Sequence, residues 1–202
     1  MKKYRLGFLA SHRGTNMQSI IDACTQGRLQ ALPAVVISNN GASAALDRAA
    51  REGIPAYHLS SKSFPDPVAL DIAMRDTLLK HEVDLVVLAG FMKRIGAKTI
   101  AAFRGRIINI HPALLPKYGG KGMYGNNIHG QVLAAGDKET GVTIHVVGDE
   151  YDAGPILVQR KVPVVDGDTP ESLADRVLAV EHQIYVETID KIIKGEIALP
   201  LK

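Results

Sequence analysis

Arg106-Ile-Ile-Asn-Ile-His-Pro-Ala-Leu-Leu-Pro116 is the stretch from which the fold of this chain can be predicted. Its apolar run is typical of a short buried strand, which should end near Pro112 because proline cannot donate a hydrogen bond within a sheet. Side chains alternate between the two faces of a strand, so Asn109 and His111 share one face and Ile110 lies on the other. In an open parallel sheet, ligands bind at the carboxyl ends of the strands. We therefore predict that this strand presents an amide and an imidazole at a ligand-binding edge.

Strands and helices alternate along the rest of the chain. Short apolar runs predict strands, whereas apolar residues spaced i, i+3, i+4, i+7, as between Met17 and Cys24, predict helices. This alternation is typical of a doubly wound, Rossmann-like α/β fold, a mostly parallel sheet with helices on both faces. Besides the strand above, the predicted strands cover residues 4–10, 34–38, 55–59, 83–89, 141–147 and 156–165, and the predicted helices lie in residues 15–24, 46–50, 66–78, 97–103, 127–135 and 169–192.

Several helix ends can be predicted from one or two residues. Thr15 and Gln18 form a capping-box pattern at the start of the first helix. Asp66-Pro67 is typical of an N-cap followed by a proline in the first turn, and Thr169-Pro170 places a proline at the start of the last helix in the same way. Gly53 is expected to end the second helix in a left-handed conformation.

Length and composition indicate one ordinary globular domain. The 202 residues are 46% hydrophobic and 22% charged, and no repeat or linker divides them, so we expect a single domain over residues 1–202. The formal charge of +3 is too small to indicate a nucleic-acid partner, and no apolar run approaches the roughly 18 residues of a membrane span. The single cysteine, Cys24, fits a reducing cytoplasm and is expected to be a buried structural thiol. We therefore expect a cytoplasmic protein that acts as a monomer or a homodimer.

The loop at residues 11–16 follows the first predicted strand and leads into a helix. Backbone N–H groups at the start of a helix attract phosphate, Gly14 lets such a group come close, and Thr15 and Asn16 offer side-chain donors. The loop matches neither the GxGxxG pattern nor the P-loop pattern, so an ordinary capped helix start remains the alternative. In a parallel sheet this loop should meet residues 90–94 and residues 109–111 at one edge.

His111 is the main candidate for chemistry. The acidic turn at residues 149–152 offers a carboxylate that would raise the imidazole pKa and keep the ring protonated, or hold it in one tautomer. The alternatives are a structural histidine and a solvated acidic hairpin. His129 and His145 suggest a metal site with His111, but their spacing matches no zinc signature, so no metal is expected. The glycine-rich loop at residues 119–125 is either a linker or a lid over the reacting groups.

Together these motifs resemble those of the folate-dependent formyltransferases. The run Asn109-Ile-His-Pro-Ala-Leu-Leu-Pro116 and the run Asp149-Glu-Tyr-Asp-Ala-Gly-Pro155 are similar to the two signatures of that superfamily, at about the same separation. Ser11-His-Arg-Gly-Thr-Asn-Met-Gln18 and Leu88-Ala-Gly-Phe-Met92 resemble segments of the branch that acts on glycinamide ribonucleotide. The resemblance covers nearly the whole chain.

The resemblance implies a function and a set of site residues. It implies that 10-formyltetrahydrofolate, as co-substrate, donates its formyl group to the amine of glycinamide ribonucleotide in purine biosynthesis, without a metal. The amine would attack the formyl carbon directly, Asn109 and a protonated His111 would donate hydrogen bonds to the oxyanion, and Asp152 would support His111. The implied residues are catalytic Asn109, His111 and Asp152; ribonucleotide-binding Gly14, Thr15, Asn16 and Glu181; and folate-binding Met92, Lys93, Arg94, Ile95, Asn109, Asp149, Glu150, Tyr151 and Asp152.

Other functions are weighed against this one. A formyltetrahydrofolate hydrolase uses similar residues on water, but it carries an extra N-terminal regulatory domain, whereas this chain is expected to begin at its first strand. The formyltransferases of methionyl-tRNA and of sugar nucleotides add a C-terminal domain, for which we expect no room in 202 residues. A folate- or nucleotide-binding module without activity would not need the trio of Asn109, His111 and Asp152.

Overall fold

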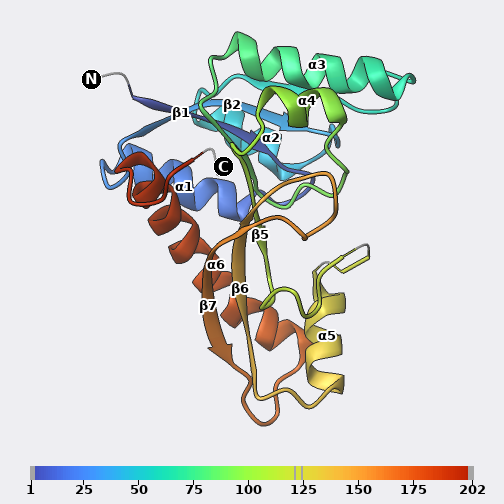
Figure 1. The fold of residues 1–202 in the computed structure, drawn as a ribbon, viewed down its shortest axis with the longest axis vertical. Coiled ribbons are helices and arrows are strands. Elements are labelled where there is room, and N and C mark those ends of the chain that lie inside the picture. The colour runs from blue at the N-terminus through green and yellow to red at the C-terminus, as the bar shows by residue number, and fades with distance from the viewer. Residues whose placement is uncertain (1–2, 121, 124, 200–202) are drawn as a thin grey trace.

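One sheet organises the protein in the computed structural model, which describes residues 3–120, 122–123 and 125–199 (Figure 1). Within these residues the strands are β1 (Tyr4–Leu9), β2 (Ala31–Ser38), β3 (Ala56–His58), β4 (Leu85–Leu88), β5 (Ile107–His111), β6 (Glu139–Val146) and β7 (Ile156–Pro163). Their order across the sheet is β3-β2-β1-β4-β5-β6-β7. The strands from β3 to β5 are parallel, while β6 is antiparallel to β5 and β7 is antiparallel to β6. The predicted mostly parallel α/β fold is confirmed.

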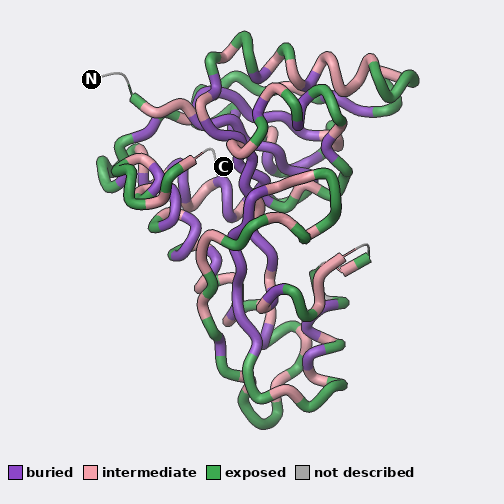
Figure 2. The backbone as a smooth tube through the Cα atoms, viewed as in Figure 1, coloured by how far each residue is buried: buried purple, intermediate pink, exposed green. Residues whose placement is uncertain are grey.

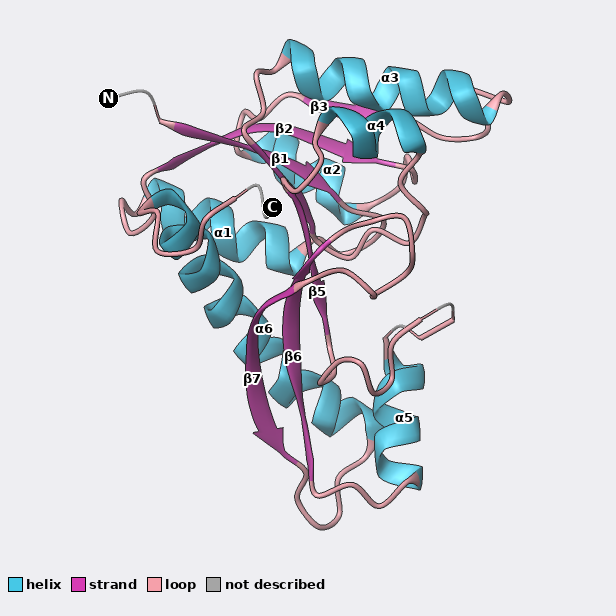
Figure 3. Ribbon diagram, viewed as in Figure 1, coloured by secondary structure: helices cyan, strands magenta, loops and turns pink. Residues whose placement is uncertain are grey.

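Helices cover both faces of this sheet (Figure 3). They are α1 (Thr15–Thr25), α2 (Ala44–Arg51), α3 (Pro67–Lys80), α4 (Ala97–Ala102), α5 (Asn126–Ala134) and α6 (Pro170–Ile193). Buried side chains of α3 and α4 join one core cluster, and those of α1, α2, α5 and α6 join the other. Among the described residues, no helix combines the length and the apolar character needed to span a membrane.

The central strands explain why the sequence shows nearly continuous apolar runs. All four residues of β4 are buried, and they alternate between the two clusters: Leu85 and Val87 face one layer of helices, and Val86 and Leu88 face the other. A strand covered on both faces has no side exposed to water, so it carries no polar alternation. The buried part of the chain follows these strands through the middle of the molecule (Figure 2).

Helix ends follow the predictions except at the first helix. Asp66 caps α3 by accepting hydrogen bonds from the N–H groups of Val68 and Ala69, and Thr169 forms a capping box at the start of α6. Gly53 adopts a φ of 66° just after α2. These contacts satisfy N–H groups at the helix starts that have no partner within the helix.

The predicted capping box at Thr15 and Gln18 is wrong. Gly14 occupies the N-cap position of α1 with a φ of 66°, and its carbonyl accepts the first helical hydrogen bond from Gln18 N. A Cβ atom at Gly14 would lie 2.9 Å from the Cβ of Ala45. The chain therefore turns into α1 through a glycine, and Thr15 already lies inside the helix.

The start of the second strand is also earlier than predicted. β2 begins at Ala31 and includes Pro33, whereas the sequence suggested a start after the proline. The register between β1 and β2 shifts next to Pro33, between Leu6 and Gly7. Such an irregularity accommodates a residue that cannot donate a hydrogen bond to its neighbour.

Tyr185 ties the long helix to the centre of the sheet. Its side chain is fully buried, and its hydroxyl lies within hydrogen-bonding distance of the carbonyls of Leu88 (2.8 Å) and Ile108 (3.2 Å). These carbonyls belong to the neighbouring strands β4 and β5; Leu88 is the last residue of β4, and Ile108 is the second residue of β5. The contact fixes α6 beneath the edge at which the predicted site residues lie.

Candidate active site

A cavity of about 430 Å³ opens at the carboxyl ends of β1, β4 and β5. The loops after these strands meet there, as the sequence predicted. Every residue that the sequence assigned to the site lines this cavity: Gly14, Thr15, Asn16, Met92, Lys93, Arg94, Ile95, Asn109, His111, Asp149, Glu150, Tyr151, Asp152 and Glu181. The position of these residues is thus established, while their individual roles remain predictions.

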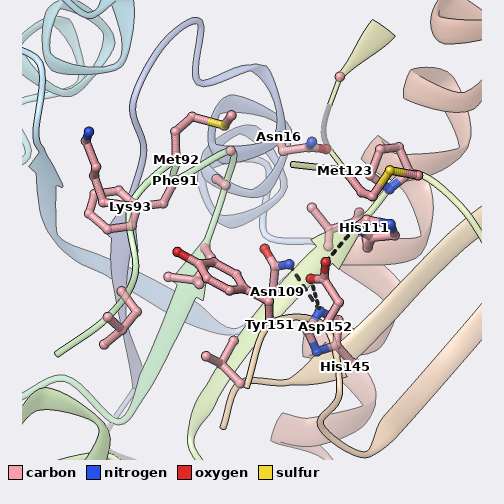
Figure 4. A pocket seen from close by; sticks show the side chains of 18 of the residues that line it. Asn16, Phe91, Met92, Lys93, Asn109, His111, Met123, His145, Tyr151 and Asp152 are labelled. Atoms are coloured by element: carbon pink, nitrogen blue, oxygen red, sulfur yellow. Dashed lines mark hydrogen bonds and ion pairs between the residues drawn. The ribbon is translucent and has the colours of Figure 1, made fainter. Parts of the chain in front are cut away.

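Asn109 and His111 project from the same face of β5 into the cavity (Figure 4). Nδ2 of Asn109 donates a hydrogen bond to Nε2 of His145, 3.1 Å away, on the antiparallel strand β6. His145 Nδ1 lies 3.1 Å from the carbonyl of Val146, which can only accept, so in the neutral ring the proton is on Nδ1 and Nε2 is the acceptor. Because an amide nitrogen has two hydrogens, this contact orients Asn109 and leaves one N–H for another partner.

His145 is a site residue whose place sequence reasoning missed. It was considered only as a metal ligand, yet it is 2% exposed and lines the cavity beside Asn109. The pairing of β5 with β6 sets Asn109 directly opposite His145. Knowing that β5 pairs with β6 would have identified His145 as a neighbour of Asn109. The order of the strands in the sheet, however, cannot be read from the sequence.

A backbone carbonyl, rather than a carboxylate, anchors His111. Its Nε2 donates to the carbonyl of Tyr118 at 2.8 Å, which fixes the ring and leaves Nδ1 facing Asp152. The separation of His111 Nδ1 from Asp152 Oδ2 is 3.7 Å, which is too long for a hydrogen bond and becomes an ion pair only when the ring is protonated. Asp152 Oδ2 instead accepts the N–H of Gly120 at 3.0 Å, and Oδ1 lies 3.5 Å from His145 Nε2.

The pKa of His111 beside Asp152 differs from the prediction. Burial lowers the pKa of His111, and the Asp152 carboxylate and the Tyr118 carbonyl offset this effect only in part. The predicted rise of the His111 pKa is therefore wrong for the free protein. Burial also disfavours ionisation of Asp152, but His145, the Gly120 N–H and His111 outweigh it and lower the Asp152 pKa. Near pH 7 the free protein thus holds a neutral His111 beside an ionised Asp152.

The opposite end of the cavity is formed by the start of α1 and by α6. Nδ2 of Asn16 donates a 2.6 Å hydrogen bond to Oε2 of Glu181, and both side chains are buried. Oδ1 of Asn16 has no hydrogen-bond partner among the described residues. Burial raises the pKa of Glu181, and the bond from Asn16 opposes that rise. This end therefore offers backbone N–H groups, an amide oxygen and a carboxyl group to a ligand.

A third part of the lining comes from the loop after β4 and from the acidic turn. The guanidinium of Arg94 donates a 2.7 Å hydrogen bond to the carbonyl of Asp149, which joins the two segments. Ile95 is buried, whereas Met92 and Tyr151 expose 38% and 50% of their surface, respectively. Apolar surface of this kind is available to a flat aromatic ligand.

The glycine-rich loop lies against the catalytic candidates. Gly120, Gly122, Met123 and Gly125 line the cavity, and the Gly120 N–H contacts Asp152. Lys121 and Tyr124, which belong to the predicted lid, lie outside the described residues. Within the residues that the structure describes, the cavity included, no three His, Cys, Asp or Glu side chains are grouped so that they could hold a metal ion.

The α/β fold, with Asn109, His111 and Asp152 in one cavity, is the arrangement expected of a formyltransferase. Comparison with known families agrees with this class. The profile of the formyl transferase family matches residues 4–189, so the chain belongs to that family.

Individual relatives point to one branch of the family. The chain is 42% identical to a chloroplastic phosphoribosylglycinamide formyltransferase of Vigna unguiculata over 98% of its length, and it spans 63% of that protein. It is 41% identical to the phosphoribosylglycinamide formyltransferase of Haemophilus influenzae, with 98% of this chain and 91% of the relative covered. The crystal structure of glycinamide ribonucleotide transformylase 1 from Symbiobacterium toebii superimposes with a TM-score of 0.91 at 41% identity, covering 98% of this chain and 91% of that one.

Proposed function

We propose that this protein transfers the formyl group of 10-formyltetrahydrofolate to the amine of N1-(5-phosphoribosyl)glycinamide. The products are formylglycinamide ribonucleotide and tetrahydrofolate, and the reaction is a step of purine biosynthesis. The observation that carries the proposal is the meeting of Asn109, His111 and Asp152 in one cavity, between the α1 loop and the loop after β4. The names of the relatives support the choice of the two substrates.

In the proposed reaction the substrate amine attacks the formyl carbon, and the carbonyl oxygen becomes an oxyanion. The second N–H of the Asn109 amide donates to this oxyanion, since His145 holds the first. A preorganised donor of this type typically contributes about 2.7–4 kcal/mol to the stabilisation of the transition state. The C–N bond to the folate then breaks, the amine loses one proton, and the folate nitrogen gains one.

His111 supports the same step through its Nδ1 atom. Nε2 donates its proton to a hydrogen bond with the Tyr118 carbonyl, so Nδ1 is the ring nitrogen that can gain or lose a proton during the reaction. The ring is neutral in the free protein because burial lowers its pKa. The oxyanion adds a second negative charge beside Asp152, which favours the protonated ring as the intermediate forms. His111 then donates to the oxyanion, and Asp152 balances its charge.

The two ends of the cavity would hold the two substrates. Gly14, Thr15 and Asn16 at the start of α1 bind the phosphate of the ribonucleotide, because backbone N–H groups at a helix start attract anions. Glu181 provides another contact to the ribonucleotide. The folate lies against Met92, Lys93, Arg94 and Ile95 and against the turn of Asp149, Glu150, Tyr151 and Asp152.

The proposal extends to the organisation of the protein. Residues 1–202 act as one catalytic domain, since every described strand belongs to one sheet. The substrates are small molecules, and neither a nucleic acid nor a membrane takes part. The protein works in the cytoplasm, which its single cysteine supports, as a monomer or a homodimer.

An absorbance assay tests the function against its alternatives. The purified protein is mixed with 10-formyltetrahydrofolate in the presence and in the absence of the ribonucleotide. A change of folate absorbance that requires the ribonucleotide, together with formylated product in a mass spectrum, supports the transferase. A change without the ribonucleotide identifies a hydrolase, and no change in either mixture identifies a binding module.

A further inference from the structure

Ser11 is a buried serine whose hydroxyl joins three loops at the edge of the sheet. It is 1% exposed and follows β1 by two positions, at the beginning of the loop that leads to α1. Its Oγ donates a 2.5 Å hydrogen bond to Oδ1 of Asn39, in the loop after β2. The same Oγ accepts the N–H of Met92 at 2.7 Å, in the loop after β4.

The backbone of Ser11 makes a separate set of contacts. Its N–H donates to the carbonyl of Gly90 at 3.0 Å, and its carbonyl accepts Nδ2 of Asn40 at 3.3 Å. These two bonds hold in place the loop that leads from β1 to α1, and they do not involve the Ser11 side chain. Only the hydroxyl contacts Met92 N, and this atom belongs to the segment from Met92 to Ile95 that forms one wall of the cavity (Figure 4).

The direction of the two hydroxyl contacts is determined. A hydroxyl has one hydrogen, and the N–H of Met92 can only donate, so the hydrogen of Ser11 points to Asn39 and a lone pair faces Met92. Asn39 thus orients the hydroxyl that fixes Met92. Without the hydroxyl, the Met92 N–H and the Asn39 oxygen both lose this partner.

We propose that Ser11 is a positioning residue that sets the affinity for the folate by fixing the Met92–Ile95 wall against the ribonucleotide loop. This inference rests on the proposed function, because it takes that wall as the folate side of the cavity. Ser11 itself does not line the cavity. The hydroxyl therefore acts through the backbone of Met92, while the ribonucleotide end, held by the backbone contacts of Ser11 and by Gly14, keeps its geometry.

The test compares Ser11→Ala with Ser43→Ala. Ser43 is a suitable control because it is 2% exposed, its hydroxyl donates only to Ser38 Oγ at 2.9 Å, and it does not line the cavity. Hydrogen exchange of the Met92 amide is measured in the ligand-free proteins. The affinities for 10-formyltetrahydrofolate and for the ribonucleotide are measured by separate titrations, and kcat and both KM values by the absorbance assay.

We expect Ser11→Ala to accelerate exchange at Met92 and to weaken folate binding about ten-fold, because the part-buried N–H of Met92 loses its hydrogen-bond partner. Ribonucleotide affinity and kcat should stay within about two- to three-fold of the wild-type values. Ser43→Ala should leave all of these quantities unchanged. Unchanged exchange at Met92 would overturn the inference, and so would an equal loss of affinity for both substrates or faster exchange without weaker folate binding.

Failure of the proposed function gives a different pattern. A wild-type protein that binds the folate but transfers no formyl group contradicts the transferase, while the binding and exchange comparison of Ser11→Ala with Ser43→Ala still decides the role of Ser11. A wild-type protein that binds no folate contradicts both.

Discussion

Replacing Asp152 with asparagine removes one negative charge from the cavity and changes little else. Asp152 has a φ of 53°, in the left-handed region that asparagine tolerates well. Its Oδ2 accepts the Gly120 N–H, and the amide oxygen of asparagine can accept the same bond. The variant therefore isolates the charge of the carboxylate from its structural contact.

The size of the effect follows from the distance between the two side chains. Asp152 Oδ2 lies 3.7 Å from His111 Nδ1, and the side chains are 12% and 4% exposed, respectively. At an effective dielectric constant of about 20, unit charges at this separation attract by about 4 kcal/mol. If His111 becomes protonated in the transition state, loss of this attraction should lower kcat by about a thousand-fold.

The assay measures kcat for Asp152→Asn at saturating concentrations of both substrates, with thermal unfolding to check the fold. Asp166→Asn is the matched control. Asp166 also lies 3.7 Å from a base, Nζ of Lys138, but both side chains are exposed, so water screens the pair and activity should not change. A folded Asp152→Asn protein with kcat within about three-fold of the wild type would refute the charge argument.

Two further predictions concern α6. Glu181→Gln keeps the size of the side chain but replaces a carboxylate by a weaker acceptor, so KM for the ribonucleotide should rise about ten-fold while kcat changes little; an unchanged KM would exclude Glu181 as a ribonucleotide contact. The hydrogen bonds from Arg176 hold the pKa of Asp168 well below its ordinary value of 3.8. A lowered pKa in the folded state stabilises the protein above pH 3.8 and loses this effect as the pH falls below it. Thermal unfolding of Asp168→Asn should therefore show a lower Tm than the wild type at pH 7 and a smaller difference at pH 3; an equal difference at both values would contradict the assignment.

Several parts of the protein could be predicted because they depend on neighbouring residues. The α/β alternation, the position of β5 and the cap at Asp66 each follow from a local pattern of apolar, polar and proline residues. The same-face placement of Asn109 and His111 needs only the alternation of a strand. The convergence of the loops needs one further rule, that the carboxyl ends of parallel strands share an edge.

Other features depend on contacts between distant segments. The glycine cap of α1 reflects the close approach of Ala45, and the early start of β2 depends on an irregular register with β1. Neither contact can be inferred from the residues that adjoin Gly14 or Pro33 in the sequence. Local propensity therefore predicted Thr15 as the N-cap residue of α1. In the structure Gly14 is the N-cap residue, because the close packing against α2 leaves no room for a Cβ atom there.

By itself, the sequence determined that the predicted site residues, though not His145, gather at one edge of the sheet, because strand periodicity and a family resemblance both concern the order of residues. Only the tertiary structure decided how those side chains interact. It placed His145 against Asn109, anchored His111 to the Tyr118 carbonyl, and reversed the expected shift of the His111 pKa. The physical reason is that burial and hydrogen-bond geometry are set by all the segments that surround a group, and these segments come from distant parts of the chain.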